Sequence, residues 1–326
     1  MKGYTTGGMK IDRWHVTNHD GWDLALRRTT WEPSPAGRRP LLIVPGYGMN
    51  SFIFGFHPRG KSLEGYLAWR GFEVWAVDLR GQGQSRRKGP RKPYGLEDLA
   101  LVDLAAAVGA VLERTATGAS RVDVIGCSLG ATLMFAQAAV GRDRRMASLV
   151  SLGGPLRWEK IHPALRWAFS SPALAGALPF RGTRALAGVA LPLLVRLPKL
   201  LSVYMNTSVT DTSRAAEMVQ TVEDPIPRIN GEIAVWMKSR DLTVRGENLT
   251  TAMGSLRNPL LCVVASADGI VPPETVLSAR EAIGSDQRDV LTVGDRDTPI
   301  AHADLFLCNE AERLVFEPLA QWLAGA

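Results

Sequence analysis

Hydrophobic residues along the chain alternate between two patterns. Short apolar runs, which are typical of buried β-strands, take turns with stretches in which apolar residues recur at helical spacing. The runs that predict strands cover residues 11–16, 22–30, 40–45, 72–78, 121–125 and 147–152. The stretches that predict helices cover residues 62–69, 96–114 and 131–140. This alternation predicts an α/β fold in which a mainly parallel sheet is covered by helices on both faces.

The alternation stops near residue 155. From there to about residue 245 the sequence contains helix-like segments interrupted by proline, without a strand pattern. A loop of this length without structure of its own is uncommon. We therefore expect a helical cap over residues 156–245, inserted between a first part (1–155) and a second part (246–326) of an α/β core. In the second part, strands are predicted over residues 259–265 and 288–293 and a closing helix over residues 311–323.

The composition is that of an ordinary folded protein. Of the 326 residues, 46% are hydrophobic and 21% are charged, and the formal net charge is +6. The densest basic cluster, residues 86–92, is broken by glycine and proline and contains no aromatic residue that would stack on a base. We interpret it as a solvated loop, with contact to an anionic surface as the alternative, and we expect no nucleic-acid partner.

The cysteines and the apolar runs bear on where the protein acts. Cys127, Cys262 and Cys308 have no paired spacing and are predicted to be free thiols in a reducing compartment. The first ten residues lack the apolar run of a secretory signal. The longest central apolar run, residues 187–195, is too short to span a bilayer. We expect a cytoplasmic protein without a transmembrane segment, and peripheral contact with a membrane stays open.

Cys127 and Ser128 are two candidate nucleophiles side by side. Residues 126–130 read Gly-Cys-Ser-Leu-Gly, which fits G-x-S-x-G centred on Ser128, between a predicted strand and a predicted helix. In that setting the two glycines allow a sharp turn that projects the central side chain above the sheet. A frame centred on Cys127 would place Ile125 and Leu129 where glycines are needed. Ser128 is therefore the predicted nucleophile, and Cys127 is predicted to pack in the interior.

A serine hydroxyl needs a base within hydrogen-bonding reach, and the base needs an orienting carboxylate. His302 lies in the loop after the last predicted strand, at the edge of the sheet where the turn at Ser128 also lies. Asp268 directly follows another predicted strand and meets the same requirement. We therefore predict His302 as the base and Asp268 as its carboxylate. The alternatives to Asp268, which also suit turns or helix starts, are Asp295, Asp297 and Asp304.

The order of serine, aspartate and histidine along the chain is that of the α/β-hydrolase superfamily, which the sequence resembles over nearly its whole length. The segments that carry the resemblance are residues 126–130, Asp-Leu-Arg-Gly-Gln-Gly-Gln-Ser at 78–85, Asp-Gly-Ile-Val-Pro-Pro at 268–273 and His-Ala-Asp-Leu-Phe at 302–306. Residues 45–50 and 232–237 are most similar to the lipase and poly(3-hydroxyalkanoate) synthase-like branch. The synthases place cysteine where this chain has Ser128, which argues against polymerase activity.

The resemblance also implies an oxyanion hole made of two backbone N–H groups. One belongs to Leu129, directly after the nucleophile, and the other to Tyr47 in the loop after the third predicted strand. Donors of this kind are typically worth about 10²- to 10³-fold each in rate. Glycine-rich residues 78–85 fail the dinucleotide fingerprint, and the histidines and cysteines lack the spacing of metal ligands. We therefore expect neither a cofactor nor a metal.

These features lead to three functional hypotheses. The first is a serine hydrolase that cleaves a small-molecule or lipid-like carboxylic ester through an acyl-enzyme, the second an acyltransferase with the same triad, and the third a non-catalytic ligand-binding protein of the same fold. Apolar residues of the predicted cap either line the pocket, which favours an apolar acyl chain, or pack against the core. They are Phe169, Leu174, Leu178, Phe180, Leu191, Leu193, Leu194 and Leu201. The oligomeric state and any movement of the cap stay open.

Overall fold

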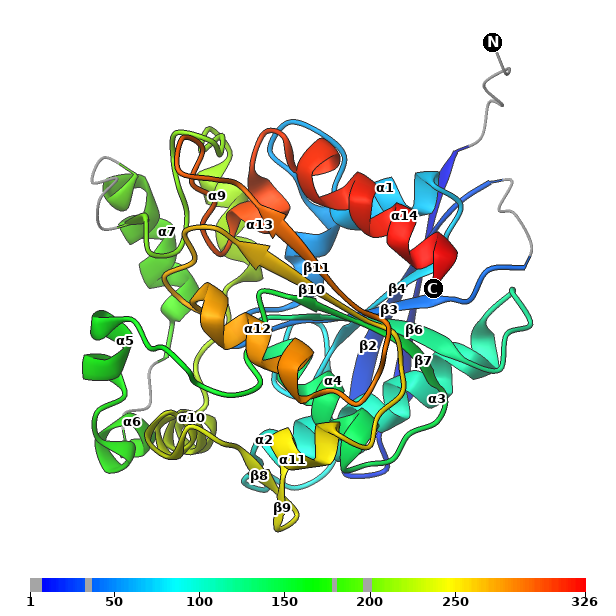
Figure 1. Cartoon of the computed structure of the whole chain (residues 1–326), viewed down its shortest axis with the longest axis horizontal. Coiled ribbons are helices and arrows are strands. Elements are labelled where there is room, and N and C mark those ends of the chain that lie inside the picture. Colours follow the sequence, from blue (N-terminus) through cyan, green and yellow to red (C-terminus); the bar gives the residue numbers. More distant parts are fainter. Residues whose placement is uncertain (1–7, 33–36, 178–180, 196–200) are drawn as a thin grey trace.

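The computed structural model describes residues 8–32, 37–177, 181–195 and 201–326. At its centre lies a nine-stranded mixed β-sheet (Figure 1). Eight strands follow one another in the order β1-β2-β4-β3-β6-β7-β10-β11, and β5 pairs with β2. The strands are β1 (Met9–Thr17), β2 (Trp22–Trp31), β3 (Leu41–Val44), β4 (Val74–Asp78), β5 (Arg86–Arg87), β6 (Val122–Cys127), β7 (Met146–Leu152), β10 (Leu260–Ala265) and β11 (Arg288–Val293).

The pairing of the strands confirms the mainly parallel sheet. β1, β2 and β4 pair antiparallel, and every neighbouring pair from β4 to β11 along that order is parallel. β4, the next strand in the chain, lies on one side of β3. β6, which comes later in the chain, lies on the other side of β3. The strand order therefore reverses between β3 and β6. α/β sheets bind their ligands at such a reversal, beyond the carboxyl ends of the strands.

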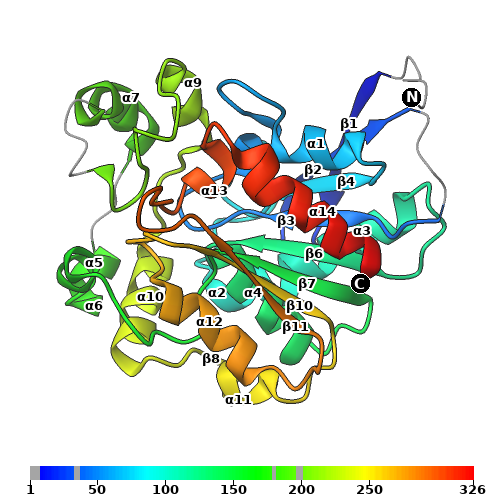
Figure 2. The same ribbon diagram turned by 45° about the horizontal axis from the view of Figure 1, so that its top comes forward.

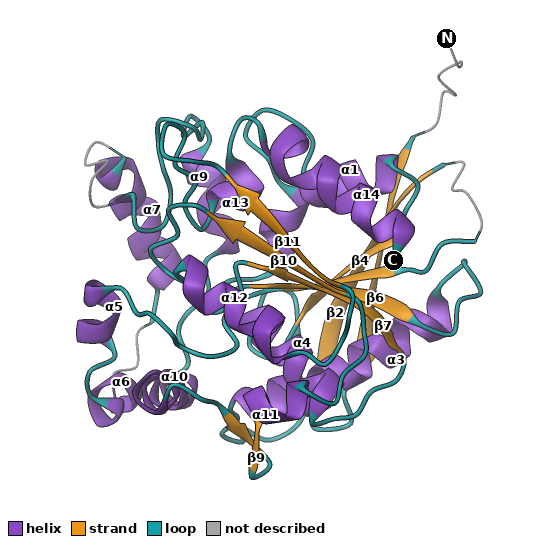
Figure 3. Cartoon of the chain, viewed as in Figure 1, coloured by secondary structure: helices purple, strands orange, loops and turns teal. Residues whose placement is uncertain are grey.

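Helices cover both faces of the sheet, as predicted (Figure 3). Because successive residues of a strand point to opposite faces, Leu42 packs into one hydrophobic core and Leu41 into the other. The core around Leu42 is completed by α3 (Leu104–Arg114), α4 (Leu129–Ala139) and α12 (Pro273–Ala282). The core around Leu41 is completed by α1 (Leu63–Trp69) and α14 (Glu317–Gly325).

Two predicted helices contain a π-helical turn. The helix expected over residues 96–114 consists of α2 (Leu96–Asp98), a π turn (Leu99–Asp103) and α3. The closing helix likewise has a π turn (Glu312–Phe316) before α14. Hydrophobic spacing over five residues does not distinguish a π turn from an α-helical turn, so the sequence predicted the helices without these irregularities.

The helix α12 and the hairpin of β8 and β9 were also not predicted. α12 forms the crossover between β10 and β11, but its buried positions include Thr275 and Ser278, which weakens the apolar pattern. The expectation that residues 155–245 contain no strand is wrong at the end of that range. There β8 (Thr243–Val244) pairs with β9 (Glu247–Asn248) across Arg245 and Gly246, which have φ of 51° and 78°. A two-residue hairpin turn needs such positive φ angles, and arginine at its first position concealed the turn.

The helices between β7 and β10 gather mainly at the end of the sheet toward which the arrowheads of β10 and β11 point, on the left of Figures 1 and 2. They include α5 (Pro163–Ala168), α6 (Pro172–Ala177), α7 (Thr183–Leu194), α9 (Ala215–Met218) and α10 (Pro227–Ser239). α11 (Leu249–Met253) packs on α4 and α12 instead. In the described part of the chain, no helix has the length and apolar character that crossing a bilayer requires.

Candidate active site

Ser128 stands between the end of β6 and the start of α4. Its backbone has φ of 50° and ψ of −124°, a conformation that a residue other than glycine keeps only where its surroundings enforce it. Two backbone hydrogen bonds fix the turn, because Ser128 N donates to Leu152 O at 2.9 Å and Ala131 N donates to Ser128 O at 3.0 Å. The turn at Ser128 therefore has the strained strand-to-helix geometry that exposes a nucleophile at the edge of an α/β sheet.

The glycines on either side of Ser128 are required by close backbone contacts. A Cβ atom on Gly126 would overlap backbone atoms of Ala131. A Cβ atom on Gly130 would overlap the carbonyl oxygen of Val44, in the neighbouring strand. The pattern centred on Ser128 therefore has a steric basis in the packing of β6, α4 and β3.

The three cysteines are free and buried. Cys127 is fully buried, and burial raises the pKa of its thiol well above the ordinary value. A thiol with a raised pKa stays protonated at neutral pH and is a weak nucleophile. The chemical environment of Cys127 thus favours the neighbouring Ser128 as the reactive group.

Asp268 and His302 are in direct contact. His302 Nδ1 lies 2.6 Å from Asp268 Oδ2, and both side chains are almost fully buried. Asp268 Oδ1 accepts the backbone N–H groups of Ile270 and Val271, each at 2.8 Å. The carboxylate is therefore held from both sides, and it fixes which ring nitrogen of His302 faces it.

Two of the alternative carboxylates near His302, those of Asp304 and Asp295, have other contacts. Asp304 is fully buried and accepts hydrogen bonds from Thr210 Oγ1 at 2.7 Å and Ala301 N at 2.8 Å. Asp295 is exposed and closes a turn by accepting the N–H groups of Asp297 and Thr298. Asp268 is thus the carboxylate that the structure places on the imidazole of His302.

The loop after β3 (residues 45–50, the β3 loop) lies against the turn at Ser128. A Cβ atom on Gly46 would be 2.9 Å from Ser128 Cβ and from the carbonyl oxygen of Cys127, so the close approach depends on glycine. Tyr47 follows directly, and it lines the same pocket as Ser128 and Leu129. The structure therefore brings both residues predicted to donate to an oxyanion to the same pocket as Ser128.

The side chain of Tyr47 ties the β3 loop to α10. Its hydroxyl donates to Oδ1 of Asn230, and burial raises the pKa of Tyr47 to about 12. Glu223 N also donates to Gly48 O at 2.8 Å, and Asn50 N donates to Thr221 O at 2.9 Å. The segment between β7 and β10 thus supports the β3 loop through several bonds.

A largely apolar pocket is lined by both Ser128 and His302. It encloses about 1400 Å³, including the part that is open to solvent. Its apolar lining comes from the core and from the segment between β7 and β10: Met49, Ile53, Leu129, Trp158, Leu165, Phe169, Tyr204, Ile233, Trp236, Met237, Val271 and Phe306. A largely apolar pocket with a few polar groups, among them Ser128 and His302, suits a ligand with an apolar body and a reactive polar group.

Comparison with known proteins places the chain in a family. Residues 39–295 match the family described as alpha/beta hydrolase fold. The protein belongs to this family. A search of the curated proteins found no match. The lipase and poly(3-hydroxyalkanoate) synthase-like branch is not singled out by the match, so that part of the resemblance stays a prediction.

Solved structures share the fold of this α/β-hydrolase. A hydrolase from Pseudomonas aeruginosa PA01 has 18% sequence identity and a TM-score of 0.60, with 97% of this chain and 98% of that chain covered. The esterase RhEst1 from Rhodococcus sp. ECU1013 has 18% identity and a TM-score of 0.62, with coverage of 96% and 98%. A bromoperoxidase from Bacillus anthracis has 15% identity and a TM-score of 0.62, with coverage of 97% and 100%. At such identities the similarity lies in the fold.

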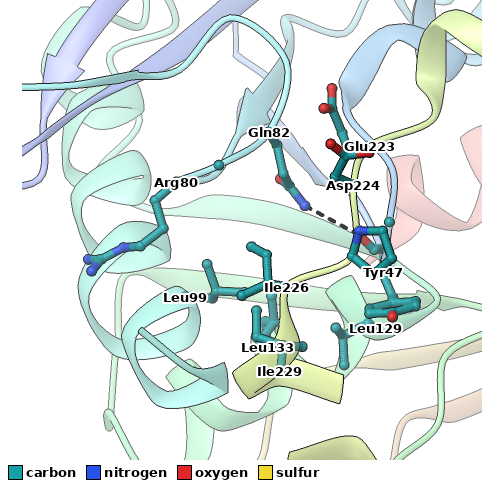
Figure 4. A pocket seen from close by; sticks show the side chains of 14 residues that line it. Tyr47, Arg80, Gln82, Leu99, Leu129, Leu133, Glu223, Asp224, Ile226 and Ile229 are labelled. Atoms are coloured by element: carbon teal, nitrogen blue, oxygen red, sulfur yellow. Dashed lines mark hydrogen bonds between the residues drawn. The ribbon is translucent and has the colours of Figure 1, made fainter. Parts of the chain in front are cut away.

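The hydrolase has a second, smaller pocket that shares Tyr47, Leu129 and Glu223 with the first (Figure 4). It encloses about 410 Å³, including the part that is open to solvent. Figure 4 shows the guanidinium of Arg80 turned away from this pocket, whereas the amide of Gln82 points toward the β3 loop and donates to Gly46 O at 3.3 Å. Through Gln82, glycine-rich residues 78–85 support the β3 loop of the hydrolase.

The apolar residues expected to roof the pocket are only partly in place. Phe169 lines the pocket, whereas Leu191 and Leu201 pack in the hydrophobic core around Leu41. Leu178 and Phe180 lie outside the described residues, and so do the side chains of Leu174, Leu193 and Leu194.

Other pocket residues of the hydrolase were not predicted. Trp158, Tyr204 and Phe306 lie in loops or very short helices, where hydrophobic spacing carries little information. Ile233, Trp236 and Met237 also line the pocket, and they are spaced i, i+3 and i+4 on α10. This spacing marks one face of a helix and was the available signal.

Proposed function

We propose that this α/β-hydrolase is a serine esterase that cleaves carboxylic esters with an apolar acyl chain. The observation that carries the proposal is the 2.6 Å contact between Asp268 and His302, together with the apolar pocket that His302 and Ser128 both line. The esterases among the solved structures of the same fold give it further support. No metal-binding cluster of histidine, cysteine or carboxylate side chains occurs among the described residues, and the proposed reaction needs none.

The first half of the proposed reaction forms an acyl-enzyme. Ser128 Oγ attacks the ester carbonyl while His302 takes its proton, and Asp268 stabilises the resulting imidazolium. The negative charge that develops on the carbonyl oxygen is bound by the backbone N–H groups of Tyr47 and Leu129. When the tetrahedral intermediate collapses, the bond to the alkoxy oxygen breaks, and that oxygen takes the proton from His302 and leaves as an alcohol.

The second half returns the enzyme to its starting state. Water loses a proton to His302 and attacks the acyl carbonyl, and Ser128 leaves with that proton. The acid product then carries the oxygen of the water molecule. Each step uses the same base and the same two N–H donors, so one arrangement of side chains serves both halves.

We propose that residues 156–245 act as a cap over this site. Trp158, Leu165, Phe169, Ile233 and Trp236 come from this range and line the pocket next to Ser128. An acyl chain bound against them is shielded from water, which strengthens the hydrogen bonds at the reacting carbonyl.

Acyl transfer to an alcohol is a second candidate, because the second pocket also reaches Tyr47 and Leu129. An acceptor alcohol bound there would lie beside the proposed oxyanion donors and would compete with water for the acyl-enzyme. The test is to add short alcohols to a reaction with a p-nitrophenyl ester and to analyse the products. Acyl transfer is supported if the ester of the added alcohol makes up a larger fraction of the products than the alcohol concentration alone would give. Free acid as the sole product contradicts it.

Labelling with a fluorophosphonate tests the esterase proposal. We expect one label per wild-type chain by intact-mass spectrometry and turnover of p-nitrophenyl esters with an optimum at medium or long acyl chains. A wild-type protein that takes no label and hydrolyses no ester contradicts the proposal and favours a ligand-binding protein of the same fold.

A further inference from the structure

The segment of residues 203–210 (the clamp) wraps around the two loops that carry Asp268 and His302. Gly269 N donates to Val203 O at 3.1 Å, directly after Asp268 in the chain. Ala303 N donates to Tyr204 O at 2.8 Å, directly after His302. One short stretch between β7 and β10 therefore holds the neighbours of both residues.

Asp304 anchors the clamp from the other side. Its carboxylate accepts hydrogen bonds from Asn206 N at 3.0 Å and from Thr210 Oγ1 at 2.7 Å, both in the clamp. The same carboxylate accepts Ala301 N at 2.8 Å, directly before His302. Asn206 Nδ2 adds a bond to Pro299 O at 2.8 Å. The backbone before His302 and the backbone of the clamp thus meet on one carboxylate.

The burial of Asp304 is costly for folding. The side chain has no exposed surface, and burial raises the pKa of its carboxyl to about 6, with a further contribution from Asp268. The other titratable groups beside it are His302, Tyr204 of the clamp and Cys308. Among the described residues, the hydrogen-bond donors to Asp304 are the backbone N–H groups of Asn206 and Ala301 and the hydroxyl of Thr210, all of them uncharged, and these bonds compensate for the loss of water.

We infer that Asp304 and residues 203–210 position His302 against Asp268 for catalysis. Asp304 is in this account a positioning residue, since it reaches the reacting atoms only through the backbone on either side of His302. The inference rests on the proposed function. It also implies that the clamp stays fixed while substrate enters, because its displacement would separate His302 from Asp268.

Three variants test the inference. Asp304→Asn removes one acceptor oxygen, and Thr210→Val removes one donor while keeping the shape of the side chain. We expect both to lower kcat for a p-nitrophenyl ester by about 10- to 100-fold with KM changed less than threefold, because displacing a base by a fraction of an ångström has effects of this order. Thr210→Ser retains the hydroxyl and is expected to restore kcat to within about threefold of the wild type.

Asp123→Asn is the matched control. Asp123 is also a buried carboxylate and binds Arg39 at 2.8 Å and Ser148 Oγ at 2.7 Å, but it lies near the start of β6, whereas Ser128 follows its end. We expect this variant to lower the unfolding temperature and to leave kcat unchanged.

Two outcomes overturn the inference while leaving the esterase in place. One is a wild-type kcat in both Asp304→Asn and Thr210→Val. The other is an equal loss in Thr210→Val and Thr210→Ser, which would assign the effect to packing instead of the hydroxyl. A wild-type protein that neither takes a fluorophosphonate nor hydrolyses an ester overturns the proposed function and the inference with it.

Discussion

Ser128 and Cys127 are neighbours in the chain with opposite surroundings. Cys127 is the last residue of β6 and is fully buried, whereas Ser128 occupies the strained turn and is partly exposed. The sequence was sufficient to rank them, because only the frame centred on Ser128 puts glycine at both flanking positions. The contact between His302 and Asp268 needed the structure, since residues that are 34 positions apart meet only through the fold.

Asp268→Asn tests the role of the carboxylate at the residue scale. The amide oxygen still accepts the N–H groups of Ile270 and Val271, so the turn is expected to persist. The amide nitrogen, however, donates a hydrogen bond to His302 Nδ1. This bond favours the tautomer with the ring proton on Nε2, which cannot take a proton from Ser128. We expect kcat for a p-nitrophenyl ester to fall by about 10⁴-fold with the unfolding temperature nearly unchanged.

Asp295→Asn is the control for this variant. Asp295 Oδ1 also accepts two backbone N–H groups, those of Asp297 and Thr298, in an exposed turn. Its replacement is expected to leave kcat unchanged. Equal kcat values in Asp268→Asn and the wild type would remove Asp268 from the mechanism.

At the scale of elements, the candidate site lies where the β3 loop, the turn after β6 and the loops after β10 and β11 meet. The β3 loop and the turn after β6 lie at the reversal of strand order, and loops after β10 and β11 supply Asp268 and His302. These positions followed from the alternation of strands and helices. The clamp could not be predicted, because several of its bonds to the core use backbone groups, which any sequence supplies, and its side-chain bond from Thr210 to Asp304 joins residues that are 94 positions apart.

Ile233→Phe tests whether α10 shapes the pocket. Ile233 is buried on the pocket wall, so a larger side chain there is expected to shorten the pocket and to move the optimum of the p-nitrophenyl ester series to shorter acyl chains. Overpacking of this kind typically costs about 1–3 kcal/mol of stability. The acetyl ester is expected to be cleaved at close to the wild-type rate.

Val235→Phe is the matched control on the same helix. Val235 is 54% exposed, and its replacement is expected to leave the chain-length optimum unchanged. An optimum that stays the same in Ile233→Phe would mean that the acyl chain binds away from α10.

At the scale of the whole molecule, the sheet and its two helix layers were predictable, whereas much of the pocket was not. The strands could be predicted because the buried apolar residues that form each of them are continuous in sequence. The pocket draws residues from Tyr47 to Phe306, many of them in loops, and their convergence depends on the complete fold. α12 was missed for a different reason: it buries threonine and serine, so its sequence lacks the apolar spacing that predicts a helix.

Asp304 links the site to the stability of the molecule. Its pKa is raised from 3.8 to about 6 in the folded state, so its contribution to stability is full below pH 3.8 and is lost as the pH rises through 6. Between pH 5 and pH 8 this loss amounts to about 1.4 kcal/mol. Asp304→Asn has no carboxyl to titrate at this position. The free energy of unfolding of this variant, relative to that of the wild type, is therefore expected to be about 1.4 kcal/mol higher at pH 8 than at pH 5. Denaturant unfolding at both pH values measures the difference, and an equal difference at the two pH values would contradict it.

The most direct test of the account is intact-mass spectrometry after fluorophosphonate treatment of the wild type, Ser128→Ala and Cys127→Ala. We expect a single label on the wild type and on Cys127→Ala, no label on Ser128→Ala, and a loss of ester turnover of about 10⁴- to 10⁶-fold in Ser128→Ala alone. A label that persists in Ser128→Ala, or ordinary turnover by that variant, would contradict the assignment of Ser128 as the nucleophile.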